Sequence, residues 1–230
     1  MGLLQDIFIA FLIGFLPVLV WLWFWLREDK LHPEPRKLLL LCFLFGMIAV
    51  PLVIPFQAFT YSHIANPIIL YVVWAIIEEV FKFGAAYVSA LRKVAFDEPI
   101  DALIYMITAA LGFAALENTF FIMDSFTRYD MVAGILTSNM RFIGATLLHS
   151  LASATVGVFI AFAFYRPKLQ RRMYTLFGII AAVMLHTMFN LSIIYSKDKD
   201  TLIAFYSVWA GIVLLLLVFE KVKSIKQPMV

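Results

Sequence analysis

Seven apolar runs, each long enough to cross a lipid bilayer as a helix, limit the fold of this chain more than any other feature. They cover about residues 3–26, 38–59, 67–91, 100–123, 139–165, 173–195 and 201–220. A helix needs ~20 largely apolar residues to cross the hydrocarbon core. The loops between the runs are short and leave no room for an inserted soluble domain. We therefore predict an all-α, polytopic membrane helical bundle of about seven transmembrane helices, forming a single integral membrane domain over 1–230.

The composition excludes a soluble protein of the same length. Of the 230 residues, 63% are hydrophobic and 14% are charged, whereas soluble domains are about 45–50% apolar and about 25% charged. The single cysteine, Cys42, rules out a disulfide framework and a cysteine-based metal site. We expect the lipid bilayer to surround the chain, and we expect no nucleic acid among its partners.

The basic residues of the loops alternate between the two ends of the predicted spans. Thirteen lie on one side: Arg27, Lys30, Arg36, Lys37, Arg92, Lys93, Arg166, Lys168, Arg171, Arg172, Lys221, Lys223 and Lys226. Four lie on the other side: Arg128, Arg141, Lys197 and Lys199. Cytoplasmic loops carry an excess of Lys and Arg. The pattern therefore predicts a multi-pass protein with its N-terminus outside and its C-terminus in the cytoplasm.

Proline and acidic residues mark two expected helix boundaries. Pro51 and Pro55 should kink or end the second span, because a proline inside a helix removes a backbone hydrogen bond. Asp97, Glu98, Pro99 and Asp101 predict a helix start, since an N-cap, acidic residues and an early proline favour the first turn. The fourth span should therefore begin near residue 99.

Ionisable and amide side chains occur inside four of the predicted spans, although an ionisable group costs ~2.5–3.5 kcal/mol at a helix centre on insertion scales. They are Glu78, Glu79 and Lys82 in the third span, Glu117 and Asn118 in the fourth, His149 in the fifth, and His186 and Asn190 in the sixth. At 1.5 Å of rise per residue, Glu78 and both histidines would lie ~14–16 Å below the outer edge, and Glu117 ~9 Å below it. We therefore expect one polar layer in the outer half of the bilayer, within a catalytic core of about 67–195.

The spacing of these residues predicts specific partners. Lys82 follows Glu78 by four residues and Glu79 by three, so its ammonium can reach either carboxylate. His186 and Asn190 are also four residues apart. Because three carboxylates share one lysine, at least one of them must be protonated, metal-bound or hydrated. Such an imbalance is unsuited to simple contacts between helices and favours a catalytic site.

The arginine that precedes this histidine cluster has two expected roles. Arg141 lies eight residues before His149 and should anchor its helix at the interface, or else contact the substrate or Glu117.

These motifs resemble the PrsW family of bacterial membrane proteases, within the superfamily of CAAX-processing and bacteriocin-processing proteases. The superfamily pattern is a Glu-Glu helix with a following basic residue, a Phe-xxx-His segment, a further histidine, and His-xxx-Asn. The matching positions are Glu78-Glu79 with Lys82, Phe113 to Glu117-Asn118, His149, and His186 to Asn190. Lys82 lies three positions after Glu79, and a lysine at this spacing is a feature of the PrsW branch. The prenyl-protease branch instead has an arginine four positions after the second glutamate. Glu117 in the place of a histidine and the Pro33-Glu34-Pro35 loop are also typical of the PrsW branch. The resemblance covers about 30–200.

The resemblance implies a peptidase of the bacterial cell membrane. Its substrate would be a single-pass membrane protein, an anti-sigma factor, cut first on the extracytoplasmic side so that a stress-responsive sigma factor is released after further proteolysis. The residues implied as catalytic are Glu78, Glu79, Glu117, His149 and His186, with Lys82, Asn118 and Asn190 in support.

Two hydrolytic mechanisms fit these residues, because the sequence has neither a zinc-binding HExxH motif nor a convincing Ser-His-Asp arrangement. In the first, Glu78 or Glu79 is the general base, the two histidines polarise the carbonyl, and either asparagine binds the oxyanion. In the second, the two histidines and Glu117 bind a metal such as zinc, and Glu79 is the base.

Two functions of other classes are also consistent with buried charge, a proton-coupled transporter and a non-catalytic scaffold. A transporter is disfavoured because the sequence has no inverted repeats or broken helix pairs around the polar layer. A scaffold would tolerate replacement of Glu78 and Glu79 without loss of hydrolysis.

Overall fold

A computed structural model describes residues 3–29, 32–195 and 200–226, and its regular structure over these ranges is entirely helical. The helices are α1 (Leu3–Leu26), α2 (Arg36–His63), α3 (Pro67–Ala86), α4 (Pro99–Arg128), α5 (Met131–Met140), α6 (Thr146–Phe162), α7 (Lys168–Tyr195) and α8 (Asp200–Lys223). Short π-helical turns extend two of these elements, Tyr87–Leu91 after α3 and Arg141–Ala145 between α5 and α6. The predicted all-α bundle is confirmed.

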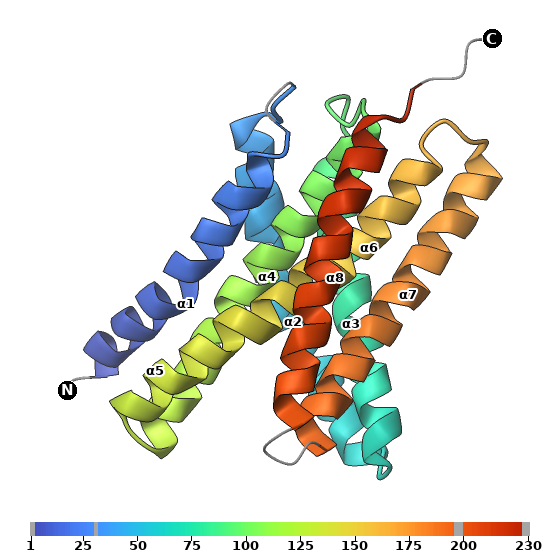
Figure 1. Cartoon of the computed structure of the whole chain (residues 1–230). Coiled ribbons are helices and arrows are strands. Elements are labelled where there is room, and N and C mark those ends of the chain that lie inside the picture. Colours follow the sequence, from blue (N-terminus) through green and yellow to red (C-terminus); the bar gives the residue numbers. More distant parts are fainter. Residues whose placement is uncertain (1–2, 30–31, 196–199, 227–230) are drawn as a thin grey trace.

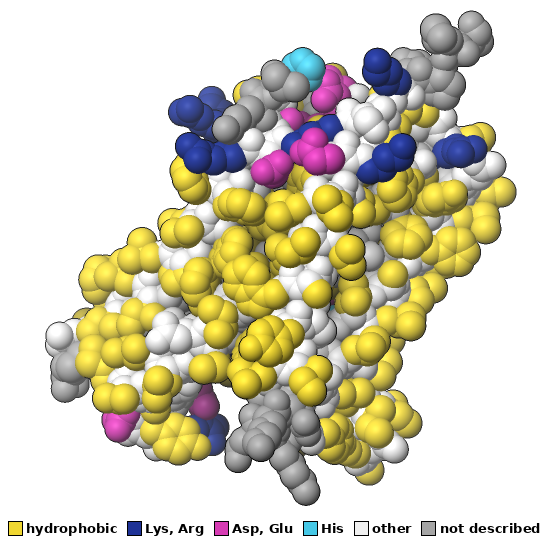
Figure 2. All heavy atoms as spheres, in the orientation of Figure 1, with side chains coloured by type: hydrophobic (Ala, Val, Ile, Leu, Met, Phe, Trp, Pro, Cys, Tyr) yellow, Lys and Arg dark blue, Asp and Glu magenta, His cyan; other side chains and the backbone are white. Residues whose placement is uncertain are grey.

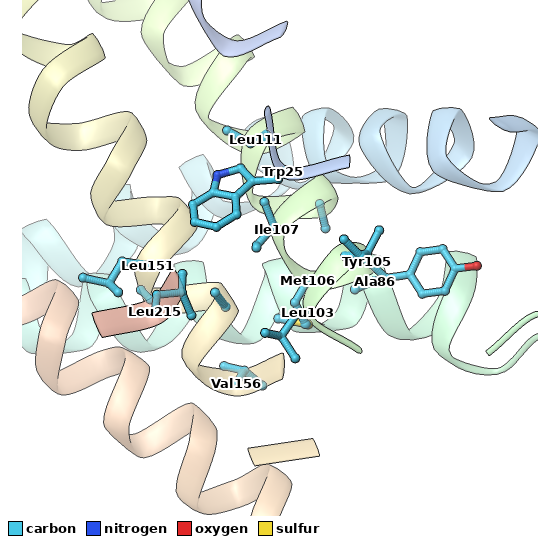
Figure 3. Packing of buried hydrophobic residues seen from close by; sticks show 14 of the residues in the cluster. Trp25, Ala86, Leu103, Tyr105, Met106, Ile107, Leu111, Leu151, Val156 and Leu215 are labelled. Atoms are coloured by element: carbon cyan, nitrogen blue, oxygen red, sulfur yellow. The ribbon is translucent and has the colours of Figure 1, made fainter. Parts of the chain in front are cut away.

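Helix α4 forms the centre of the bundle, with α1, α2 and α6 packed around it (Figure 1). Every residue of α4 from 99 to 115 is buried. Figure 3 shows how α4 is covered, with Trp25 of α1, Ile107 of α4, Leu151 of α6 and Leu215 of α8 converging on one apolar cluster. The outer surface is also apolar along the middle of the bundle, as expected for a protein in lipid (Figure 2).

Glycines allow α2 and α4 to approach each other backbone to backbone. A Cβ atom added to Gly46 of α2 would lie 2.0 Å from the carbonyl oxygen of Ala109, and one added to Gly112 of α4 would lie 2.0 Å from that of Phe43. Small residues at helix crossings are a common means of close packing in membranes. This crossing fixes α2 beside the helix that carries Glu117.

Six of the described helical segments are long and apolar enough to cross a membrane, α1, α2, α4, the continuous segment from α5 to α6, α7 and α8. The seventh expected span corresponds to α3, whose 20 residues include Glu78, Glu79 and Lys82. These three charged side chains are buried against the other helices, so α3 can pack in the bundle without exposing them to lipid.

Three helix boundaries can be compared with their expected positions. Helix α2 continues through Pro51 and Pro55 to His63, so these prolines do not end the helix, and the alternative that they kink it stays a prediction. The predicted start of α4 is confirmed: Pro99 is in its first turn, and Glu98 and Asp101 form a reciprocal capping box. The fifth span begins at Met131, earlier than expected, because α5 joins α6 through a π-helical turn.

Basic side chains gather at the end of the bundle where α8 stops and α7 starts (Figure 2). Lys30, Lys197 and Lys199, which contributed to the expected orientation, lie outside the described residues. We refer to this end as the basic end. That it faces the cytoplasm stays a prediction.

Candidate active site

The polar residues of the predicted layer meet around one cavity, away from the basic end. The cavity has a volume of about 620 Å³, and its polar wall consists of Gln57, Glu78, Glu117, Arg141, His149, His186 and Asn190. The rest of its wall is apolar and largely aromatic, with Trp74, Phe113, Phe120, Phe121, Phe189 and Phe205 among the lining residues. Residues from α2, α3, α4, α6, α7 and the Arg141–Ala145 turn therefore contribute to a single site.

The helical phase of α3 turns its charged residues inward. Asn66 caps the start of α3 by accepting hydrogen bonds from the amides of Ile68 and Ile69. From there, Ala75, Glu78, Glu79, Lys82, Ala85 and Ala86 fall on the buried side of the helix. Ile76 and Val80 point outward and are exposed. The three-to-four residue spacing thus puts the charged groups against α4, α6 and α7.

Glu79 is fully buried and both of its oxygens have partners. Lys82 donates to Oε1 over 2.5 Å, and Nδ1 of His186 lies 2.7 Å from the same oxygen. Ser153 of α6 donates to Oε2 over 3.3 Å. The carboxylate therefore joins α3 to α6 and α7 and is not among the residues that line the cavity.

His149 lies between Lys82 and Glu117. Its Nδ1 is 2.9 Å from Nζ of Lys82, and its Nε2 is 3.1 Å from Oε2 of Glu117. Because an ammonium group can only donate, Nδ1 accepts this hydrogen bond and Nε2 donates to the carboxylate. The arrangement fixes the tautomer of His149, whose ring centre lies 5.2 Å from that of His186.

Glu117 forms an ion pair with Arg141 at the edge of the cavity. The same guanidinium donates through Nε to Oδ1 of Asn118 over 2.6 Å and lies over the ring of Phe121 at 3.9 Å. Asn118 donates in turn to Thr146 over 2.9 Å. Of the two expected roles of Arg141, the contact with Glu117 is the one found. Asn118 is buried behind the arginine and does not line the cavity.

Glu78 has a partner that sequence reasoning missed. Gln57 of α2 donates to Oε1 of Glu78 over 3.0 Å. The other oxygen, Oε2, is buried without a hydrogen-bond partner among the described residues and lies 3.6 Å from Nε2 of His186. Gln57 precedes the predicted core of 67–195. An amide two residues after Pro55 in an otherwise apolar span was the signal that could have revealed it.

Glu78, His149 and His186 could hold a metal ion, because one ligand atom from each lies within 4.8 Å of the other two. Oε2 of Glu78 and Nε2 of His186 face each other, and Nδ1 of His186 is held by Glu79, as is typical of histidines that bind metals. His149 could join them through Nε2 once that nitrogen has lost its proton and its contact with Glu117, because Lys82 holds Nδ1. Two histidine nitrogens and one carboxylate oxygen fit zinc. This set differs from the expected one, in which Glu117 took the place of Glu78.

Asn190 lies one turn beyond His186 on α7 and lines the cavity. All five residues expected to be catalytic are thus brought together, four of them on the cavity wall and Glu79 behind it. Of the three supporting residues, Asn190 reaches the cavity, while Lys82 and Asn118 hold other residues of the site.

Comparisons with known proteins show what the chain is similar to. The model of a family described as PrsW family intramembrane metalloprotease matches residues 34–220. A protein named Protease PrsW from Geobacillus kaustophilus is 25% identical over 220 residues, which are 93% of this chain and 89% of that protein. Another of the same name, from Clostridioides difficile, is 27% identical over 190 residues, or 78% of this chain and 77% of that protein. No solved structure shows significant similarity to this chain.

Proposed function

The chain belongs to the PrsW family of intramembrane proteases, and we propose that it hydrolyses peptide bonds where Glu78, His149 and His186 meet. The observation that carries this proposal is the buried oxygen of Glu78 that has no hydrogen-bond partner among the described residues and faces Nε2 of His186. A buried carboxylate oxygen is costly unless a ligand or a proton compensates it. A site that binds a metal or a reactive water supplies that compensation.

We propose that zinc or a similar divalent ion is held by Oε2 of Glu78, Nε2 of His186 and Nε2 of His149, which releases its proton as the ion binds. Such an ion, when bound, lowers the pKa of its water so that hydroxide forms near neutral pH. Gln57 holds the other oxygen of Glu78 and thereby sets the direction of Oε2. Glu79 keeps the proton of His186 on Nδ1, which leaves Nε2 free to bind.

Glu117 is the second carboxylate on the cavity wall, and it is placed to accept a proton from the attacking water. It differs from Glu79 in being accessible, since its side chain is 17% exposed against 0% for Glu79. Arg141 forms an ion pair with it at the edge of the cavity. Asn190 and Arg141 line the cavity and carry N–H groups that can donate to the oxyanion of the substrate.

The substrate we propose is a single-pass membrane protein, an anti-sigma factor, cut on the extracytoplasmic side. The cavity lies away from the basic end, which the distribution of Lys and Arg predicts to be cytoplasmic. Its largely apolar and aromatic wall suits a segment that lies partly in the membrane. The substrate class itself is implied by the resemblance to the PrsW branch.

The proposal is tested by co-expressing the protein with a candidate anti-sigma factor that carries a different tag at each end. The variants Glu78→Gln and Glu79→Gln are compared with the wild type at matched membrane abundance. We expect the wild type to give a fragment cut on the extracytoplasmic side and Glu78→Gln to give none. Glu79→Gln should lower the amount of this fragment about 10–100-fold, as replacement of other residues that position metal ligands does. Unchanged cleavage by both variants would support a scaffold and would refute the proposed site.

A further inference from the structure

A second cavity lies at the basic end, between the end of α3 and the start of α7. Its volume is about 510 Å³, and none of the residues of the candidate active site lines it. One side of its wall is apolar and aromatic, with Phe83, Tyr87 and Leu91 from α3 and the turn that follows. The other side is basic, with Lys168, Arg171 and Arg172 from α7. The two sides therefore differ sharply in chemistry.

The three basic residues of this cavity are not neutralised by acidic side chains of the described ranges. Within the described part of the chain, none of them forms an ion pair with a carboxylate, and no acidic residue lines this cavity. They also lie within the first five residues of α7, where the helix dipole disfavours positive charge. Their presence is therefore not explained by stabilisation of α7. An external anion would offset both the mutual repulsion and the unfavourable dipole.

We propose that this cavity binds the phosphate group of an anionic phospholipid. Basic pockets between transmembrane helices bind the head groups of such lipids. The cavity is at the end of the bundle, the level at which head groups lie, and its aromatic side offers a surface for the start of an acyl chain. Arginine suits this role because its planar fork can donate two hydrogen bonds to one phosphate.

The lipid would lie between α3 and α7, two of the helices that contribute to the candidate active site. Phe83 directly follows Lys82 on α3, and α7 carries His186 further along its length. The proposal does not depend on the hydrolytic function, because it concerns binding at the other end of the bundle.

Native mass spectrometry of the full-length protein, delipidated in detergent, tests the proposal by titration with phosphatidylglycerol and with phosphatidylcholine. The wild type is compared with the triple variant Lys168→Gln, Arg171→Gln, Arg172→Gln. A matched control is the triple variant Arg36→Gln, Lys37→Gln, Lys221→Gln, which removes the same charge from exposed residues at the same end, outside the cavity. Circular dichroism and elution volume establish that each variant is folded.

We expect the wild type to bind phosphatidylglycerol more tightly than phosphatidylcholine. In the cavity variant the ratio of the two affinities should fall roughly 100-fold, since each of the three basic residues near an anionic lipid contributes roughly fivefold. The control should lose less than about fivefold. Thr175→Trp, which fills the cavity and keeps every charge, should also lose the preference, and it serves as the test if the triple variant does not fold. Equal losses in the cavity variant and the control, or wild-type binding by Thr175→Trp, would overturn the proposal.

Discussion

Nδ1 of His186 lies 2.7 Å from Oε1 of Glu79, and this contact joins α7 to α3 at the base of the candidate active site. Lys82 donates to the same oxygen over 2.5 Å. Oε1 of Glu79 thereby holds two other residues, and Nε2 of His186 is left to face Glu78. The two adjacent glutamates thus have different environments, one inside the protein and one on the cavity wall.

Replacement of Lys82 should show how much the site depends on its buried cation. Lys82 is fully buried and contacts both Glu79 and His149. Lys82→Met leaves the charge of Glu79 unpaired, which typically costs about 3–5 kcal/mol in a buried pair. We expect cleavage of a reporter substrate to be lost, whereas Lys82→Arg should retain part of it because the charge survives. Full activity of Lys82→Met at normal membrane abundance would show that the lysine has no such role.

Gln57 should affect the rate of cleavage more than stability. Gln57→Leu removes the hydrogen bond that orients Glu78 and keeps a side chain of similar size. We expect cleavage to fall about 10–100-fold, in the range observed for residues that orient metal ligands. Ser62→Ala is the control, since Ser62 is an exposed polar residue on the same helix whose hydroxyl contacts Phe59 and His63 of that helix. Equal rates for the two variants would remove Gln57 from the site.

The crossing of α2 and α4 should tolerate no added side chain. Gly112→Ala would place a Cβ 2.0 Å from a backbone oxygen, and backbone cannot move aside cheaply. Overpacking typically costs about 1–3 kcal/mol, so thermal unfolding in detergent should shift to lower temperature. Gly84→Ala is the matched control, because a Cβ there meets nothing within 4 Å. A similar melting temperature for both variants would mean that the helices are not in close contact.

The sequence predicted the fold and the meeting of the polar residues because both follow from local patterns. Apolar runs of ~20 residues give spans, and Glu78, His149 and His186 stand at similar depths in theirs. The separate roles of the glutamates were not predictable, since Glu78 and Glu79 differ by one residue, or about 100° of helix rotation. Which of them faces the cavity depends on how α3 is rotated against its neighbours.

The contacts of Arg141 and Gln57 depend on tertiary structure in the same way. Arg141 begins a π-helical turn, which carries its side chain from the expected interface to Glu117. Gln57 reaches Glu78 because α2 continues as a helix beyond Pro51 and Pro55, where an end was possible. Neither the turn nor the unbroken helix has a specific signature in a single sequence.

At the basic end, Asp29 should make stability depend on pH. Burial, with repulsion from Asp101 and Glu98, raises the pKa of Asp29 from 3.8 to about 7. Because the folded state binds this proton more tightly than the unfolded chain does, the stabilisation is full below about pH 4 and is lost as the pH rises through about 7. The melting temperature should therefore rise when the pH is lowered from about 8 to about 5. Asp29→Asn should reduce that rise.

The control for this prediction is Asp124→Asn, which removes the same charge from an exposed position of α4. It should leave the pH dependence of the melting temperature near that of the wild type. A rise that is unchanged in Asp29→Asn would assign the effect to other acidic groups.

The central claim, that Glu78, His149 and His186 hold the ion of a hydrolytic centre, is tested most directly on purified protein in nanodiscs. Metal content is measured by elemental mass spectrometry, and cleavage of a single-pass reporter is followed in the same samples, before and after chelation. We expect about one ion of zinc or a similar divalent metal per chain in the wild type. Chelation should remove both the ion and the cleavage, and return of the ion should restore both. Glu78→Ala and His186→Ala should lack the ion at normal helix content. Cleavage at the wild-type rate by metal-free protein, or by Glu78→Ala, would contradict the claim.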